Sequence, residues 1–98
     1  MTHGVLTLVG ATLMQDALGV VRRSEIDRDV FCEVSSVSAS EWYEAARADL
    51  NPEYRFRVFF ADYQGEQVCR YEGKTYAIYR TYRDDDYTEL YAERKAGA

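Results

Sequence analysis

The feature that most constrains the fold is the alternation of side chains in the second half of the chain. Tyr54, Phe56 and Val58 alternate with Arg55 and Arg57, which is the two-residue period of a strand with one buried face. Short, turn-rich connections join stretches of this kind, and consecutive strands joined in this way are antiparallel. The sequence predicts four such strands, over residues 54–60, 66–71, 75–82 and 87–93.

The first half predicts further extended structure. Residues 5–14 are apolar and β-branched, residues 15–19 carry a turn signal that ends in Gly19, and residues 20–23 resume an extended pattern. Together they predict a hairpin. The polar residues 25–29 predict a connection, and the alternation of residues 30–35 predicts one more strand.

Residues 38–48 have a different character and predict a short helix. Ser38 and Glu41 have the spacing of a capping box, in which each side chain accepts a hydrogen bond from the other residue's backbone N–H. Pro52 is expected to end the helix, because the residue before a proline avoids the helical conformation. Four residues share one helical face by their spacing: Trp42, Ala45, Ala46 and Asp49.

The predicted fold is therefore mainly β. It is a small antiparallel β-barrel or sandwich, with a short helical insertion between the early strands and a C-terminal four-strand meander. Such a sheet has edges that must be protected, and oligomerisation is one way to cover them.

Composition limits the possible functions. With 98 residues the chain has room for one domain, residues 1–98. Twelve Lys and Arg face seventeen Asp and Glu, a net charge of −5, and this argues against a dedicated nucleic-acid clamp. No apolar run is long enough for a membrane span, and the N-terminus lacks the basic region of a signal peptide, so we expect a cytoplasmic chain.

No catalytic, cofactor-binding or metal site is predicted. Cys32 and Cys69 do not form a CxxC motif and are expected to be reduced, buried thiols. His3 is the only histidine, too few ligands for a zinc site and a poor base for a catalytic serine. The aspartates 84–86 fit a solvated hairpin tip better than a calcium or magnesium site.

The tyrosines of the second half leave two interpretations open. They could form a stacking platform for nucleic-acid bases, or bury their rings in the core or an interface with their hydroxyls at the wet rim. The acidic balance of the chain favours the second interpretation. The residues concerned are Tyr71, Tyr76, Tyr79, Tyr82, Tyr87 and Tyr91.

Several short motifs follow one another in a characteristic order. They are Val30-Phe31-Cys32-Glu33-Val34-Ser35-Ser36-Val37, Ser40-Glu41-Trp42-Tyr43-Glu44-Ala45, Leu50-Asn51-Pro52-Glu53-Tyr54, Asp62-Tyr63-Gln64-Gly65-Glu66, Tyr71-Glu72-Gly73-Lys74-Thr75-Tyr76, Tyr79-Arg80-Thr81-Tyr82 and Glu89-Leu90-Tyr91. In this order and spacing the chain resembles the head-closure, or stopper, proteins of long-tailed bacteriophages, which are also called head–tail joining or head–tail adaptor proteins. The resemblance covers nearly the whole chain, although the N-terminal hairpin is more apolar than in many members of the family.

The resemblance implies a non-enzymatic virion protein. It implies a small barrel that assembles with itself into a dodecameric ring below the portal-bound adaptor protein, closes the DNA exit of the filled head, and offers a docking face to a tail terminator or tail completion protein. The assembly would form in the host bacterial cytoplasm and become the head–tail connector of the virion. Double-stranded DNA would pass without specific recognition, and an acidic lining would not trap it.

The resemblance also implies a place for the helical insertion. In this family the segment between the early strands and the final strands reaches the central channel, and here that segment is residues 38–51. Its candidate channel or ring-contact residues are Ser40, Glu41, Trp42, Glu44, Arg47, Asp49 and Leu50.

Two alternatives remain beside these expectations. Trp42 and Leu50 could anchor the helix to its own barrel or to the next subunit, and the helix could instead merely plug an open end of the barrel. The whole chain could be a small monomeric acidic β-rich binding or regulatory module, for example an inhibitor that mimics DNA.

Overall fold

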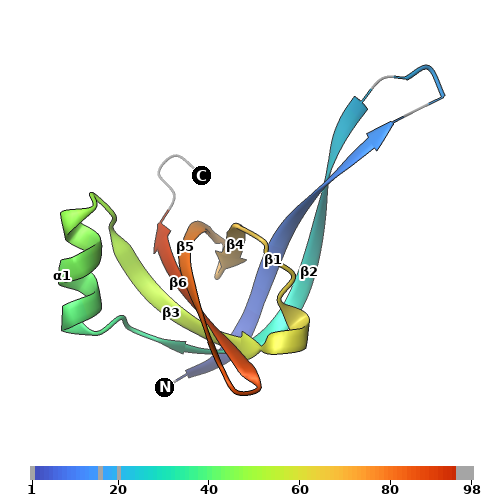
Figure 1. The fold of residues 1–98 in the computed structure, drawn as a ribbon. Coiled ribbons are helices and arrows are strands. Elements are labelled where there is room, and N and C mark those ends of the chain that lie inside the picture. The colour runs from blue at the N-terminus through green and yellow to red at the C-terminus, as the bar shows by residue number, and fades with distance from the viewer. Residues whose placement is uncertain (1, 16, 20, 95–98) are drawn as a thin grey trace.

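A computed structural model describes residues 2–15, 17–19 and 21–94 and closes six antiparallel strands into a barrel (Figure 1). The helix α1 (Ala39–Arg47) lies between the second and third strands, and a short 3-10 helix, η1 (Phe60–Asp62), follows the third. The mainly β class and the helical insertion predicted from the sequence are confirmed. The strands are β1 (Thr2–Gln15), β2 (Val21–Ser35), β3 (Pro52–Phe59), β4 (Val68–Tyr71), β5 (Lys74–Asp84) and β6 (Tyr87–Arg94).

The strand order departs from a four-strand meander. Around the barrel it is β1-β2-β3-β6-β5-β4, and β4 closes the ring by pairing with β1, where Leu8 lies opposite Cys69. The strands β4, β5 and β6 are consecutive antiparallel neighbours, as predicted, but β3 pairs with β6 and not with β4. The chain crosses between β3 and β4 because β4 is needed to cover the exposed edge of β1, and full closure removes such an edge.

The segment between β3 and β4 is held to β2 by a partly buried ion pair. The Arg28 guanidinium donates to the Glu66 carboxylate at 2.6 Å and to the backbone carbonyl of Asp62 at 2.7 Å. The second carboxylate oxygen of Glu66 accepts from the backbone N–H of Gln64 at 2.7 Å. Only 6% of the Glu66 side chain is exposed, so these partners stabilise a charge that burial alone would disfavour.

The strand β2 is longer than the sequence pattern indicates. Residues 25–29, predicted as a connection, continue the strand in register with β1. Asp29 accepts a hydrogen bond from the Thr7 hydroxyl at 2.7 Å, and Asp27 pairs with Arg70 at 2.7 Å. The prediction was wrong because neighbouring segments satisfy these polar side chains: those of Asp27 and Asp29 are paired on one face of β2, and Arg28 pairs with Glu66 on the other. The predicted turn lies partly outside the described residues, which do not include 16 and 20.

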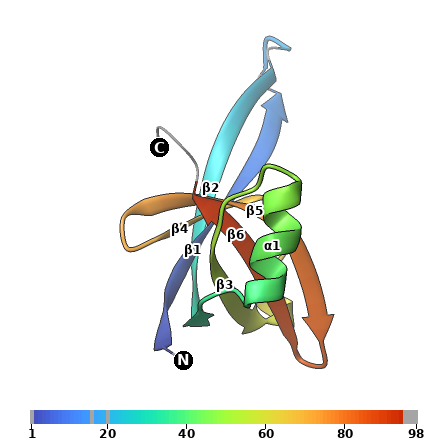
Figure 2. The same cartoon turned by 90° about the vertical axis from the view of Figure 1, so that its left-hand side faces the viewer.

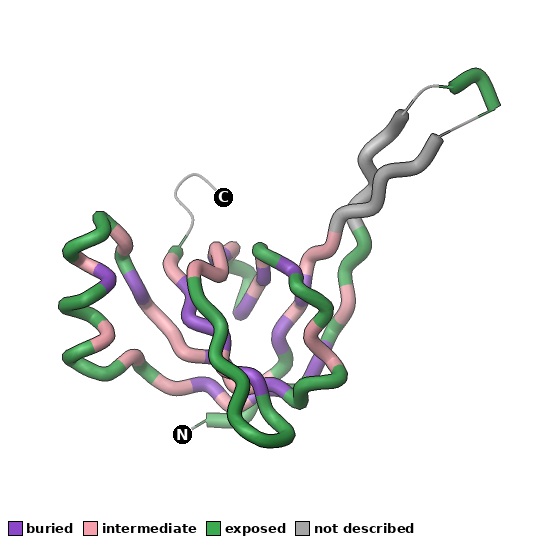
Figure 3. The backbone as a smooth tube through the Cα atoms, in the orientation of Figure 1, coloured by how far each residue is buried: buried purple, intermediate pink, exposed green. Residues whose placement is uncertain are grey.

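The core lies inside the barrel (purple in Figure 3). Its centre is aromatic, with the ring of Tyr54 at 5.6 Å from each of Phe56, Tyr71 and Tyr76. Gly4 allows close approach on the β1 side, because a Cβ there would lie 3.1 Å from Cε1 of Tyr71. The buried residues of the core are Leu6, Leu8, Val30, Cys32, Val34, Phe56, Val58, Cys69, Tyr71, Tyr76, Leu90 and Ala92.

The tyrosines do not form one platform. Tyr71 and Tyr76 belong to the core, while Tyr82 and Tyr87 are exposed. Tyr79 and Tyr91 line a groove that is described below. A single row of stacked bases could not reach all six rings, so the structure favours the interpretation in which the rings serve the core and interfaces.

Two elements project from the barrel in different directions (Figures 1 and 2). The first, which we call the hairpin arm, is residues 10–26, where β1 and β2 pair with one another from Gly10↔Ile26 to Gln15↔Val21. At about 3.4 Å per residue this ribbon is about 20 Å long before its turn. The second is α1, on the opposite side of the barrel in Figure 1. With both projections the molecule measures 52 × 30 × 24 Å.

Candidate functional site

The N-terminus of α1 has half of the predicted capping box. The Ser38 hydroxyl oxygen accepts a hydrogen bond from the backbone N–H of Glu41 at 3.2 Å, as the sequence predicts. The Glu41 carboxylate does not complete the box, because it pairs with Arg80 on β5. A local capping interaction is thereby replaced by a contact that joins the helix to the barrel.

The helix ends at Arg47 and is capped by the residues that follow, so Pro52 does not end it as predicted. The backbone N–H of Asp49 donates to the carbonyl of Ala46 at 3.1 Å, and that of Leu50 donates to the carbonyl of Ala45 at 3.0 Å. Asp49 has a φ of 60°, so the pair of bonds is a Schellman motif with an aspartate in the left-handed position usually held by glycine. Pro52 instead begins β3.

A groove of about 600 Å³ lies between α1 and the strands β5 and β6. We call it the α1 groove. The helix contributes its Glu41 and Ala45 face, Leu50 lines it from the segment that follows, and the barrel contributes Tyr79, Arg80 and Tyr91. The groove therefore combines an apolar floor with charged and hydroxyl groups, a composition typical of binding sites.

A β-bulge places two adjacent residues of β5 in this groove. Ile78 pairs with Ala92 and Arg80 pairs with Tyr91, so Tyr79 is an extra residue in β5. In a regular strand Tyr79 and Arg80 would point to opposite faces, but a bulge redirects a side chain. Strict alternation over residues 75–82 carries no signal of the extra residue, so this pair of groove residues could not be predicted from the sequence.

An ion pair fastens α1 to the barrel. The guanidinium of Arg80 donates from Nε to Oε1 of Glu41 at 2.9 Å and from Nη2 to the same oxygen, and it stacks 4.1 Å from the centroid of the Tyr91 ring. The hydrogen bonds that Arg80 donates to the Glu41 carboxylate raise the pKa of Arg80. Only 12% of the Glu41 side chain is exposed, so this contact is shielded on the side of the helix.

The Tyr79 hydroxyl is a donor in need of an acceptor. Its oxygen is buried and has no hydrogen-bond partner among the described residues. Burial, together with the nearby charge of Glu41, raises the pKa of Tyr79 to about 12. The group therefore stays protonated at neutral pH, and a buried donor without a partner costs free energy.

The structure brings together four of the seven candidate residues from the sequence. Ser40, Glu41, Glu44 and Leu50 line the α1 groove. The other three do not line it: Trp42, Arg47 and Asp49 are exposed. The predicted helical face was also wrong, because only Ala45 among its four members is buried.

Trp42 does not anchor the helix to its own barrel. Its side chain is 45% exposed, and its ring meets Tyr43 edge to face at 5.4 Å. Leu50 does reach the groove. Of the two predicted anchors, then, only Leu50 faces the barrel in the isolated chain.

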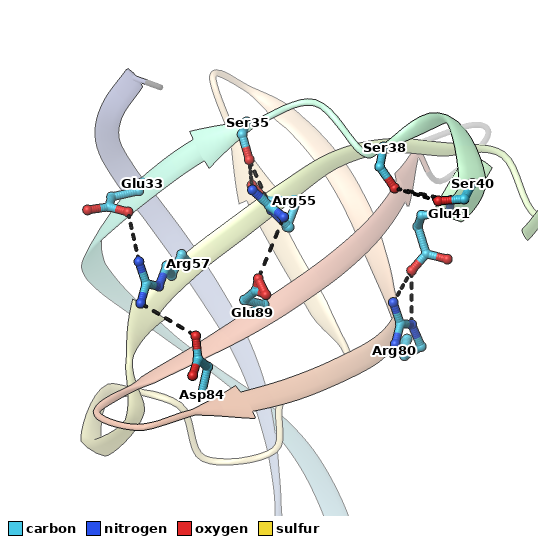
Figure 4. Close-up of polar contacts among 10 residues, drawn as sticks. All are labelled: Glu33, Ser35, Ser38, Ser40, Glu41, Arg55, Arg57, Arg80, Asp84 and Glu89. Carbon is cyan, nitrogen blue, oxygen red and sulfur yellow. Dashed lines mark hydrogen bonds and ion pairs between the residues drawn. The ribbon is translucent and has the colours of Figure 1, made fainter.

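The outer face of β2, β3, β5 and β6 carries alternating charges beside the groove (Figure 4). Arg55 donates to the Ser35 hydroxyl at 3.1 Å and lies 3.7 Å from Glu89. Arg57 lies 3.7 Å from Glu33 and 3.9 Å from Asp84. Arginines thus balance many of the carboxylates on this face of the acidic chain.

The two cysteines are buried in the core, as the sequence predicts, and are free thiols. Burial raises the pKa of Cys32 to about 11 and that of Cys69 to about 12. Because the thiolate is the reactive form, both groups are poor nucleophiles at neutral pH.

Within the described residues, no group of three or more His, Cys, Asp or Glu side chains could hold a metal ion. In the same part of the chain, no helix has the length and apolar character needed to cross a membrane. No model of a known protein family matches this chain, and a comparison with curated proteins found no significant match.

Proposed function

We propose that this chain is a structural protein of a tailed-bacteriophage virion without enzymatic activity. It assembles as a dodecameric ring below the portal-bound adaptor, closes the DNA exit of the filled head, and provides the face on which the tail docks. The resemblance in motif order over nearly the whole chain supports this function.

One structural observation carries the proposal: the barrel core is complete without its two projecting elements. Among the described residues, the core cluster consists of side chains from the strands, and α1 buries only Ala45. A helix that plugged the barrel would contribute several large side chains to that cluster. Elements that the core does not need are available for contacts between subunits or with a channel, which supports the role proposed for residues 38–51.

The charge distribution is compatible with a DNA conduit. The chain has a net charge of −5, so a ring of copies would repel a passing polyanion and not retain it. An inhibitor that mimics DNA would need an array of unpaired carboxylates. Glu33, Asp84 and Glu89 are each paired with an arginine, so this face of the barrel does not offer such an array.

The proposal is tested by mass spectrometry of purified mature particles. We expect the chain at the copy number of a ring component and in constant ratio to the portal protein. Particles assembled without it should fill with DNA and then lose it, or fail to join tails. Absence of the chain from mature particles would reject the proposed function.

A further inference from the structure

We propose that the tip of the hairpin arm of one copy binds the α1 groove of a second copy, so that the chain associates head to tail. The biological role of this contact rests on the proposed ring function, which it deepens by naming the surfaces that meet. The contact itself is a property of the chain alone.

The geometry allows such an arrangement. The hairpin arm and α1 lie on opposite sides of the barrel (Figure 1), and the molecule is 52 Å long against 30 and 24 Å in the other directions. A contact between two different surfaces at opposite ends is heterologous, and repetition of a heterologous contact generates a ring when the rotation closes.

The arm presents an exposed apolar residue at its tip. Leu18 is 89% exposed at the end of the arm, next to Gly19 with its φ of 81°. A two-stranded ribbon without further support is only marginally stable in water. A groove that encloses the tip would bury Leu18 and also hold the ribbon in place.

The α1 groove has the room and the chemistry for this occupant. Its volume of about 600 Å³ lies in the range of sites that enclose a drug-sized ligand, so a leucine and its neighbouring turn residues fit. Ala45, Leu50 and Tyr91 supply an apolar floor. Tyr79 lines the groove as well, and its hydroxyl is buried without a hydrogen-bond partner among the described residues.

The two surfaces differ in charge by sequence. Residues 38–51 carry three carboxylates and one arginine, whereas the hairpin arm, residues 10–26, carries two arginines, one aspartate and one glutamate. Arg80 already neutralises Glu41 inside the groove. Glu44 at the groove remains largely exposed, with Arg47 at 3.8 Å as its partner, and can pair with an arginine of the arm.

The experiment is a dilution series of the isotope-labelled full chain, followed by NMR from about 20 µM to about 1 mM, which detects a Kd as weak as about 1 mM. We expect concentration-dependent shifts of the backbone amides at residues 17–19 and 44–50, with one common Kd. Leu18→Ser should weaken the association at least about tenfold. The matched control is Phe31→Thr, which removes an apolar side chain that is 84% exposed on β2 and should leave the association unchanged.

Mixing two defective variants tests the head-to-tail contact directly. Ala48→Trp fills the groove from its own helix but leaves the tip intact. If Ala48→Trp does not fold, Ser40→Trp is used in its place, because it also fills the groove from the helix. Neither Leu18→Ser nor the groove variant should associate alone. Labelled Leu18→Ser should show shifts at its groove when the unlabelled groove variant is added, and none when unlabelled Leu18→Ser is added.

The proposal is overturned if the wild-type chain shows no concentration-dependent shifts up to about 1 mM, if the shifts map to other surfaces, or if the mixed variants do not associate. These outcomes are independent of the particle analysis. A chain that is present in virions but lacks this contact rejects only the inference, and a chain that associates in this way but is absent from virions rejects only the proposed function.

Discussion

Replacing residues 38–50 with a short glycine-containing turn should leave a folded barrel. The backbone permits the change because Ser35 lies opposite Arg55 in the β2–β3 ladder, so a short connection can span the gap. Pro52 and Tyr54, which pair with β6, are retained. The barrel core should be preserved, because the described core cluster contains no residue from this segment.

The expected loss in free energy of unfolding is about 1–3 kcal/mol. Burial of the Ala45 side chain contributes about 1 kcal/mol, and the partly exposed Glu41–Arg80 pair contributes at most about 1 kcal/mol. Uncovering the Tyr91 ring costs about 1 kcal/mol more. Halving the length of the connection returns about 0.6 kcal/mol, because a shorter loop loses less entropy on closure.

The measurement is urea unfolding followed by far-ultraviolet circular dichroism, since the deletion removes Trp42, the only tryptophan. Phe56→Ala is the reference for damage to the core. Phe56 has 0% exposure, and its truncation should cost about 3–5 kcal/mol. A deletion variant that loses as much as Phe56→Ala, or does not fold, would refute the reasoning and identify the helix as part of the core.

Three further predictions concern stability. Asp49→Gly should raise the free energy of unfolding by about 0.5–1 kcal/mol, because glycine adopts the left-handed conformation without steric cost. Urea unfolding measures this change, and a decrease in the free energy of unfolding would contradict the assigned helix end. Glu66→Ala should cost about 3 kcal/mol in the same assay by leaving the Arg28 guanidinium without its buried partner, and a loss below about 1 kcal/mol would show that the pair matters little. The pKa of Cys69 rises from its ordinary 9.0 to about 12 on folding, so the unfolded chain loses this proton at a lower pH than the folded chain. The free energy of unfolding should therefore fall as the pH rises from 9 towards 12, and this thiol should not affect it below pH 9. Replacing Cys32 and Cys69 together by alanine should keep the fold, cost about 1–2 kcal/mol in packing, and reduce that alkaline loss; an unchanged pH profile would reject the assignment.

The sequence by itself determined the local structure of this protein. The alternation around Phe56 sets the period of a strand, because the side-chain period of an extended backbone depends only on the chain itself. The short connection between the predicted strands 66–71 and 75–82 was equally readable, and Glu72 and Gly73 both have positive φ there. The N-cap at Ser38 was predictable for the same reason, since donor and acceptor lie three residues apart.

Only the tertiary structure decided which strands pair and which side chains meet. The pairing of β3 with β6, the closure of β4 on β1 and the length of β2 depend on edges formed by distant residues. The α1 groove depends on the same kind of contact. Glu41 had a local partner available at Ser38 but pairs with Arg80, 39 residues away, and Tyr79 lines the groove because of a bulge against β6. Local patterns cannot encode these choices, because each arises from competition between a near partner and one that folding brings into reach.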